Sequence, residues 1–293
     1  MTPEFRAAVS DAMRAACIAE IRAFKPGNVS IASAGHGMSA RDFIVSAQAA
    51  ARALSGAGLS VGERILHAVR ATRDEVGCNT NLGIVLLCAP LVHAALEQTG
   101  AATLRVRLKQ VLANLSVHDA ERTFEAIRLA SPGGLGTAEK HDVRQPATVT
   151  LLEAMREAAE RDRIAYQYIS VFKDVFDIGS ESVRQGLKRW GSEDWAAVLC
   201  YLDLLGRFTD THIVRKWGLR TAQRVSEKAS RLEKQLRSSP DAQHMMPVLR
   251  DWDEELKRDG INPGTSADLT VASLLAVRLE GLLEHCFKGC DVA

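Results

Sequence analysis

Four polar, helix-breaking clusters interrupt a sequence that otherwise reads as apolar helices, and they contain most of the residues that could do chemistry. The clusters are Lys25–Ser30 with Gly35–Met38, Cys78–Gly83, Asp210–Lys216, and Asn262–Leu269. Each cluster lies at or near the predicted end of a helix. We therefore expect the four to converge in the fold into a single pocket.

The clusters carry the residue types that bind phosphate. A helix start exposes backbone N–H groups and the positive end of the helix dipole, and both attract phosphate oxygens. Glycine lets a ligand approach the backbone, and Lys or Arg neutralises phosphate charge. The candidate phosphate-binding residues are Lys25, Gly27, Asn28, Ser30, Thr80, Asn81, Gly83, Arg215, Lys216, Gly264 and Thr265. Asp210 and Asp268 are candidate ligands of Mg²⁺, which takes few carboxylates together with waters and substrate phosphates.

Each cluster also has an ordinary structural interpretation. Pro-Gly and Asn-Pro-Gly are common turn signals. The polar run Asn79–Asn81 could cap the following helix, and Asp210 could cap a short one. Arg215 and Lys216 could be a solvated helix end, and Asp268 a first-turn acid.

Weaker candidates lie beside the clusters. His36 stands between two glycines, and Glu20 lies about one helical turn before Lys25. Asp142 and Asp162 are more ordinarily a cap or an ion-pair partner than a ligand. The sequence contains neither a Walker P-loop nor a GxGxxG motif, so residue types alone indicate only a nucleotide or phosphate site.

The elements that must position these residues are helices, because apolar residues recur with helical periodicity and no alternating strand pattern is found. We expect an all-α fold, a single domain of roughly a dozen helices over residues 1–293. The predicted helices cover about 2–23, 40–54, 61–75, 81–96, 102–115, 117–130, 148–159, 165–177, 180–190, 193–207, 211–217, 221–238, 246–259 and 267–287. The irregular segment 131–148 is a candidate lid.

Composition narrows the classes of function. A net charge of +1 offers no bulk field for nucleic acid or anionic membrane. The first residues have no apolar signal core, and the apolar stretch 82–96 is too short to cross a bilayer, so we expect a cytoplasmic protein. The cysteines indicate core thiols, with a metal or disulfide pair at Cys286 and Cys290 as the alternative. The surfaces of the helix pairs leave a homodimer open as the oligomeric state.

At the same clusters the sequence resembles the triphosphoribosyl-dephospho-CoA synthase family. The matching segments are KPGNVS at 25–30, NTNLGIVLL at 79–87 and ADLTVA at 267–272, supported by 125–136, 142–143 and 151–168. The family's best-known branch has PKPGLVD and NTHKG, where this chain has Phe24, Asn28, Ser30, Asn81 and Leu82. The forms found here are more similar to a divergent branch from archaea and methylotrophic bacteria, connected with one-carbon carrier cofactors.

The resemblance implies a transferase that moves the ribose triphosphate of ATP to the ribose 2′-hydroxyl of dephospho-CoA and releases adenine. Breaking the N-glycosidic bond develops oxocarbenium character. Holding the triphosphate with Mg²⁺ could supply about 7–11 kcal/mol of the barrier. The implied catalytic residues are Asn79, Asn81 or His36 as hydrogen-bond donors to adenine, and Glu20 toward the cation or the acceptor hydroxyl.

Two alternatives stay open at this point. The same fold could perform a related nucleotide-dependent step in the biosynthesis of a methanopterin-type or methanofuran-type cofactor. It could also be a nucleotide-binding protein without catalysis, because Ser30 and Asn81 replace titratable residues of the well-known enzymes.

Overall fold

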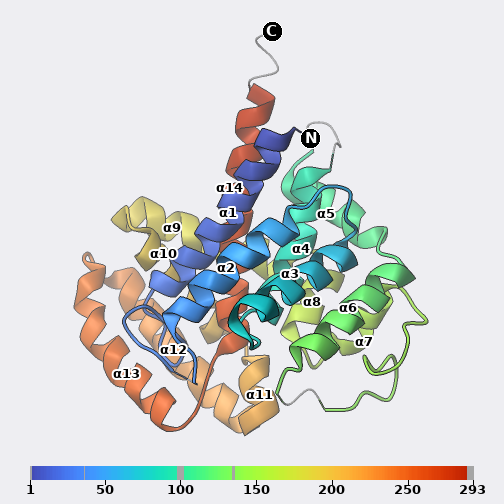
Figure 1. Cartoon of the computed structure of the whole chain (residues 1–293). Coiled ribbons are helices and arrows are strands. Elements are labelled where there is room, and N and C mark those ends of the chain that lie inside the picture. Colours follow the sequence, from blue (N-terminus) through green and yellow to red (C-terminus); the bar gives the residue numbers. More distant parts are fainter. Residues whose placement is uncertain (1, 36, 98–101, 134–135, 289–293) are drawn as a thin grey trace. The chain divides into compact units, whose positions relative to one another are not determined.

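The structure, a computed structural model, describes residues 2–35, 37–97, 102–133 and 136–288, with side chains as far as His285. Those residues form helices and no strand, apart from isolated bridges that join Ser30 to Ser33 and Gly35 to Met38. The all-α prediction is confirmed. The helices are α1 (Pro3–Arg22), α2 (Ala40–Leu54), α3 (Val61–Val76), α4 (Leu82–Leu96), α5 (Leu104–Ala113), α6 (Val117–Ala130), α7 (Leu151–Ala158), α8 (Arg163–Ile169), α9 (Ser180–Trp190), α10 (Glu193–Arg207), α11 (Thr211–Trp217), α12 (Leu219–Ser238), α13 (Met246–Arg258) and α14 (Gly264–Lys288) (Figure 1).

The chain divides into two compact units. Unit 1 comprises Met1–Ala16, Val45–Phe172 and Leu275–Ala293, and unit 2 comprises Cys17–Ile44 and Lys173–Leu274. That residues 1–293 form a single domain stays a prediction. Within the described part of the chain, no helix combines the length and apolar composition needed to cross a bilayer.

In unit 1, α3 packs closely on α6. Gly62 makes this approach possible, because a Cβ atom there would lie 2.5 Å from the backbone oxygen of Asp119. The Asp119 carboxylate accepts hydrogen bonds from the N–H of Gly62 at 2.8 Å and from the N–H of Ser116 at 2.9 Å. One acidic side chain therefore satisfies the exposed N–H groups at the starts of two helices.

Pro90 lies inside α4, the apolar core helix of unit 1. Proline has no N–H, so the carbonyl of Leu86, one turn earlier, loses its usual helical partner. The hydroxyl of the buried Tyr168 donates a hydrogen bond to this carbonyl at 2.6 Å. Tyr168 thus replaces the donor that Pro90 removes.

We expect Tyr168→Phe to lower the free energy of unfolding by about 1–3 kcal/mol, because the Leu86 carbonyl would be buried without a donor. Urea unfolding followed by circular dichroism measures this change. Pro90→Ala is the matched control, since alanine restores the N–H that serves Leu86. In that background Tyr168→Phe should cost clearly less. An equal cost in both backgrounds would show that the hydroxyl does not act through Leu86.

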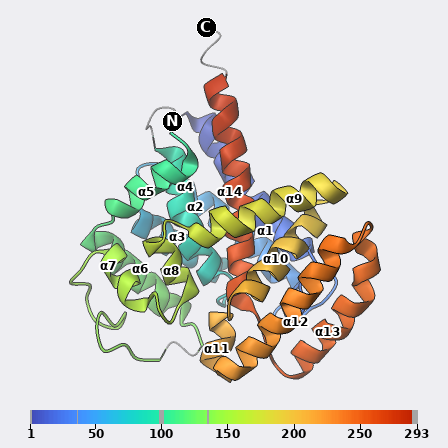
Figure 2. The same ribbon diagram turned by 180° about the vertical axis from the view of Figure 1, so that it is seen from behind.

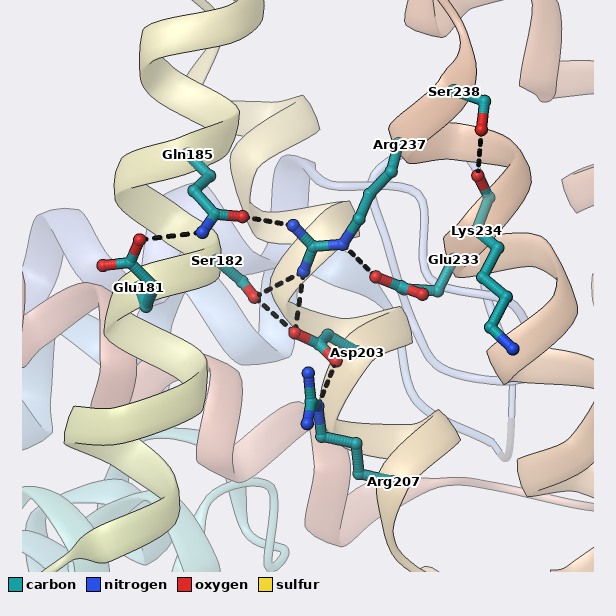
Figure 3. A network of polar contacts seen from close by, with 9 residues as sticks. All are labelled: Glu181, Ser182, Gln185, Asp203, Arg207, Glu233, Lys234, Arg237 and Ser238. Atoms are coloured by element: carbon teal, nitrogen blue, oxygen red, sulfur yellow. Dashed lines mark hydrogen bonds and ion pairs between the residues drawn. The ribbon is translucent and has the colours of Figure 1, made fainter.

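In unit 2, α10 packs between α9 and α12 (Figure 2). Figure 3 shows the polar network that joins these helices around the buried Asp203. The Asp203 carboxylate accepts from Arg207 Nε at 2.5 Å, from Arg237 Nη2 at 2.8 Å and from the Ser182 hydroxyl at 2.6 Å. Arg237 also pairs with Glu233. These contacts fix α9, α10 and α12 against one another. The charged groups named here pair with each other inside the network.

Most helix bounds agree with the sequence within a few residues, but the helix expected over 165–177 is wrong. Helix α8 ends at Ile169, Val171 and Phe172 have φ of 53° and 54°, and a π-helical turn, Val175–Gly179, follows. The left-handed conformation costs about 1–2 kcal/mol per residue. It places the Phe172 side chain in a fully buried position, with its ring centroid 5.8 Å from that of Tyr168. Core burial therefore overrides local helix preference.

Candidate functional site

Lys25, the first residue of the first cluster, is buried at the end of α1. Its side chain is 0% exposed, and its ammonium group lies 3.1 Å from the carboxylate of Glu20, whose side chain is 5% exposed. The same ammonium donates to the carbonyls of Glu20 at 2.6 Å, Val29 at 3.1 Å and Ala23 at 3.2 Å. These carbonyls belong to the end of α1 and the turn after it. The ammonium donors are therefore used within the chain, and this does not favour the expected phosphate contact.

Burial dominates the electrostatics of this ion pair. Loss of water raises the pKa of Glu20 and lowers the pKa of Lys25, and the attraction between the two groups opposes both shifts. The role expected of Glu20, contact with the reacting sugar or acceptor, is not supported by such a paired and buried carboxylate. Glu20 and Lys25 instead stabilise the turn that begins the first cluster.

Gly27 forms the tight turn that the sequence predicts, but protein atoms surround it. Its φ is +79°, and a Cβ there would lie 2.8 Å from a methyl carbon of Leu256 and 2.9 Å from Pro263. Its N–H donates to the Asp253 carboxylate at 2.8 Å. The close approach at Gly27 is therefore made by α13 and the fourth cluster, and contact of this glycine with a ligand stays a prediction.

The first and fourth clusters meet in unit 2. Asn28, which is buried, donates through its amide to the side-chain oxygen of Asn262 at 2.8 Å. The hydroxyl of Tyr201, from α10, donates to the carbonyl of Pro26 at 2.7 Å. The Ser30 hydroxyl is buried without a hydrogen-bond partner. These contacts fix the course of the turn from both sides.

The third and fourth clusters are joined by Asp210. One carboxylate oxygen accepts from the N–H groups of His212 at 2.9 Å and Ile213 at 3.2 Å, so Asp210 is the N-cap of α11. The other oxygen accepts from the N–H and the hydroxyl of Ser266, both at 2.8 Å. Burial raises the pKa of Asp210, and these hydrogen bonds oppose the shift.

These surroundings do not fit a resident Mg²⁺ at Asp210, because a hard cation needs carboxylate lone pairs that the protein has already used. Asp268, the second candidate ligand, is half-buried in the first turns of α14. Across the described residues, no group of three or more His, Cys, Asp or Glu side chains is placed to hold a metal ion. The Cys286–Cys290 pair lies outside the described side chains.

The other candidate phosphate-binding residues of unit 2 differ in how exposed they are. Arg215 and Lys216 are exposed near the end of α11. Thr265 is buried, with its hydroxyl 3.1 Å from that of Thr211. A Cβ on Gly264 would lie 3.0 Å from the His212 ring, so this glycine too admits protein atoms. His36 lies outside the described residues.

The second cluster lies in unit 1, between α3 and α4. The side-chain oxygen of Asn79 accepts from the N–H of Leu82, the first residue of α4, at 3.1 Å, whereas the N-cap residue Asn81 makes no capping hydrogen bond through its own side chain. Asn81 is buried and donates to the Thr72 hydroxyl at 3.1 Å, and the Thr80 hydroxyl lies 2.6 Å from that of Ser46. Gly83 is half-buried in the first turn of α4.

A pocket of about 200 Å³ opens at this cluster. Asn79 and Cys78 are exposed beside it, and the buried Asn81 also lines it. Its other walls come from α3 and from the end of α6 at Ser131. Asn79 thus presents an amide N–H₂ in a pocket while its oxygen caps α4. Because the second cluster lies in a different unit from the other three, the convergence of all four stays a prediction.

Sequence reasoning missed the residues that hold the first cluster in place. Asp253 and Lys257 lie one turn apart on α13, and Lys257 Nζ is 3.0 Å from the Asp253 carboxylate. The same carboxylate accepts from the Ser33 hydroxyl at 2.5 Å. The only available signal was an acid–base pair at helical spacing, which ordinary surface helices share. Asp142 and Asp162, the weaker candidate ligands, have the ordinary structural roles that the sequence also allowed. Asp142 forms an ion pair with Arg144, and Asp162 caps α8.

Comparisons with known proteins agree with one another. The model of the family described as ATP:dephospho-CoA triphosphoribosyl transferase matches residues 6–287. A solved structure from Archaeoglobus fulgidus is described as a suggested triphosphoribosyl-dephospho-CoA synthase. It is similar to this chain with 26% sequence identity and a TM-score of 0.62. The match covers 80% of this chain and 98% of that one. No curated protein matches the sequence.

Proposed function

This chain belongs to the ATP:dephospho-CoA triphosphoribosyl transferase family, and from that premise we propose that it moves the triphosphoribosyl group of ATP to a hydroxyl of a dephospho-CoA-type acceptor. The observation that carries the proposal is the match over residues 6–287, which includes all four polar clusters. The related structure from Archaeoglobus fulgidus supports the same assignment.

The proposed reaction breaks the bond between C1′ of the ATP ribose and N9 of adenine. A bond forms between that C1′ and the acceptor oxygen. The proton of the acceptor hydroxyl is lost, and adenine takes up a proton as it leaves. The transition state has oxocarbenium character, so the main tasks of the protein are to hold the triphosphate and to assist departure of the base.

We assign departure of adenine to the pocket at the second cluster. The amide of Asn79 can donate a hydrogen bond to a ring nitrogen on which electron density builds as the glycosidic bond breaks. Because Leu82 holds the amide oxygen, the orientation of the donor is set before the substrate arrives. Asn81, which is buried on Thr72, shapes the floor of this pocket.

Within unit 2, the exposed cations of the polar clusters stay the candidates for binding phosphate. Arg215 and Lys216 are accessible, whereas Lys25 is used inside the first cluster. Lys25 is a positioning residue in this proposal, since it holds the turn that Asp253 and Asn262 fix from the other side. Mg²⁺ is assigned to ATP as part of the substrate, because the Asp210 carboxylate is fully hydrogen-bonded by the chain.

The test is release of adenine, measured by chromatography after incubation of the purified chain with ATP and Mg²⁺. One arm contains dephospho-CoA, a second contains pterin precursors of one-carbon cofactors, and a third contains no acceptor. We expect adenine with dephospho-CoA and none without an acceptor. Adenine release with a pterin precursor but not with dephospho-CoA would identify the acceptor as a precursor of a one-carbon cofactor. A folded chain that binds ATP and releases no adenine in any arm would refute the proposal.

A further inference from the structure

Helix α4 is apolar except for His93 near its C-terminal end, and this histidine is contacted from both sides. Arg64 Nε donates to His93 Nδ1 at 3.2 Å, and His93 Nε2 lies 3.0 Å from a carboxylate oxygen of Glu97. The His93 side chain is 20% exposed, and that of Glu97 is 46% exposed. The three groups form a chain that runs from a buried cation to an accessible acid.

The contacts of His93 determine its tautomer. A guanidinium group can only donate, so Nδ1 must accept and carries no proton. The ring proton is therefore on Nε2, which donates to Glu97. Burial and the nearby Arg64 charge both lower the pKa of His93, and Glu97 opposes the shift. His93 is thus a neutral hydrogen-bond donor near pH 7.

Arg64 is a buried cation whose direct partners are neutral. It is 4% exposed, and its Nη1 donates to the carbonyls of Leu54 at 2.5 Å and Gly56 at 2.7 Å. Burial lowers the pKa of Arg64 to about 10, so the group stays charged at neutral pH. The acids that act on this charge without contacting it are Glu97, on the far side of the imidazole, and Glu63. A buried charge in this setting is stabilised by any anion that can approach it.

The Arg64–His93–Glu97 chain borders two pockets. A pocket of about 470 Å³ is lined by Arg6, Arg64, His93, Glu97 and the glycine-containing loop 56–60. A second, of about 240 Å³, shares His93 and Glu97 with it. The larger one is within the size range of small-molecule sites. It carries two arginines against one acid, so its lining is net positive.

We propose that the larger pocket binds a small molecule through a phosphate or carboxylate group that faces Arg6 and Arg64. The bound oxyanion competes with Glu97 for the proton on His93 Nε2, so Glu97 limits the affinity. The loop 56–60 is compatible with a compact ligand, because Gly58, at φ +68°, has no atom within 4 Å of its Cβ position. The ligand fills the pocket beyond its anionic group, since phosphate alone is much smaller than 470 Å³.

This site is distinct from the adenine pocket proposed above. His93 lies near the end of α4 and Leu82 at its start, which places them roughly 16 Å apart at about 1.5 Å per residue. The two pockets share no lining residue. The inference therefore holds or fails independently of the proposed transfer reaction.

Isothermal titration of the full chain with inorganic phosphate and with acetate, at constant ionic strength, tests the proposal. Glu97→Gln should tighten binding about two- to fivefold, because the competing charge is lost while Nε2 keeps an acceptor. Arg6→Gln should weaken binding by a similar factor. Glu160→Gln, an exposed acid of unit 1 away from the pocket, is the matched control and should change neither affinity. Comparison of the two anions shows which oxyanion the site prefers.

Ring ¹⁵N spectra of histidine locate the binding. We expect an unprotonated Nδ1 for His93 and a shift of its Nε2 signal on addition of the preferred anion. His244, which is exposed in unit 2, serves as the reference. If neither anion moves the His93 signals, or if Glu97→Gln and Arg6→Gln leave both affinities unchanged in folded protein, the pocket is not an anion site.

Discussion

Replacing Asn79 with aspartate is expected to lower the rate of adenine release by about 10²–10³-fold, the usual effect of removing one preorganised donor from a developing negative charge. Aspartate keeps the oxygen that accepts from the Leu82 N–H, so α4 remains capped. It loses the amide N–H₂ and adds a negative charge where the leaving base gains electron density. The measurement is single-turnover adenine release at saturating ATP.

Asn79→Ala separates the two functions of this side chain. It removes both the donor and the cap without adding a charge, so it should slow adenine release no more than aspartate does, and lose about 1 kcal/mol of stability in addition. Binding of ATP can be followed independently through Cys78, which lines the same pocket and is exposed, whereas Cys17, Cys88 and Cys200 are buried. We expect ATP to slow thiol labelling of Cys78 in all these proteins. An aspartate variant that releases adenine at the original rate would remove Asn79 from the mechanism.

Replacing Lys25 with methionine is expected to lower the free energy of unfolding by about 3–5 kcal/mol, because the buried Glu20 carboxylate loses its counter-charge. Three backbone carbonyls also lose a donor. The double variant Lys25→Met with Glu20→Gln should be more stable than Lys25→Met alone, because no uncompensated charge remains. Urea unfolding of both proteins measures the difference.

The pH dependence of Lys25→Met provides an independent check. Without the ammonium, burial raises the pKa of Glu20 further above its ordinary value of 4.5. A raised folded-state pKa means that the native carboxyl binds a proton more tightly than the unfolded one. The loss of folding free energy caused by the unpaired Glu20 carboxylate is therefore absent below pH 4.5. It grows as the pH rises from 4.5 toward the raised pKa of the folded state. A stability difference from the double variant that does not change with pH would argue against a charged Glu20.

Local patterns were sufficient to predict most of the helices. The bounds of α6, α10 and α11 agree with the expected ones, because polar caps and amphipathic spacing act over one or two turns. The same local logic predicted that Asp210 could cap α11 and that PG and NPG would form turns. It failed at Val171 and Phe172, where the burial of one aromatic ring outweighs local backbone preference.

The sequence by itself determined the helical class of this protein, the positions of its polar breaks and the family to which their motifs point. Only the tertiary structure decided which of these polar residues face inward. The sequence shows only that Lys25 and Asp210 are charged. In the fold, Lys25 contacts backbone carbonyls and the Glu20 carboxylate, and Asp210 accepts hydrogen bonds from backbone N–H groups and the Ser266 hydroxyl, all within unit 2. The reason is that desolvation and hydrogen-bond partnership depend on residues far apart in the chain, such as Gly27 with Asp253, and no local spacing encodes them.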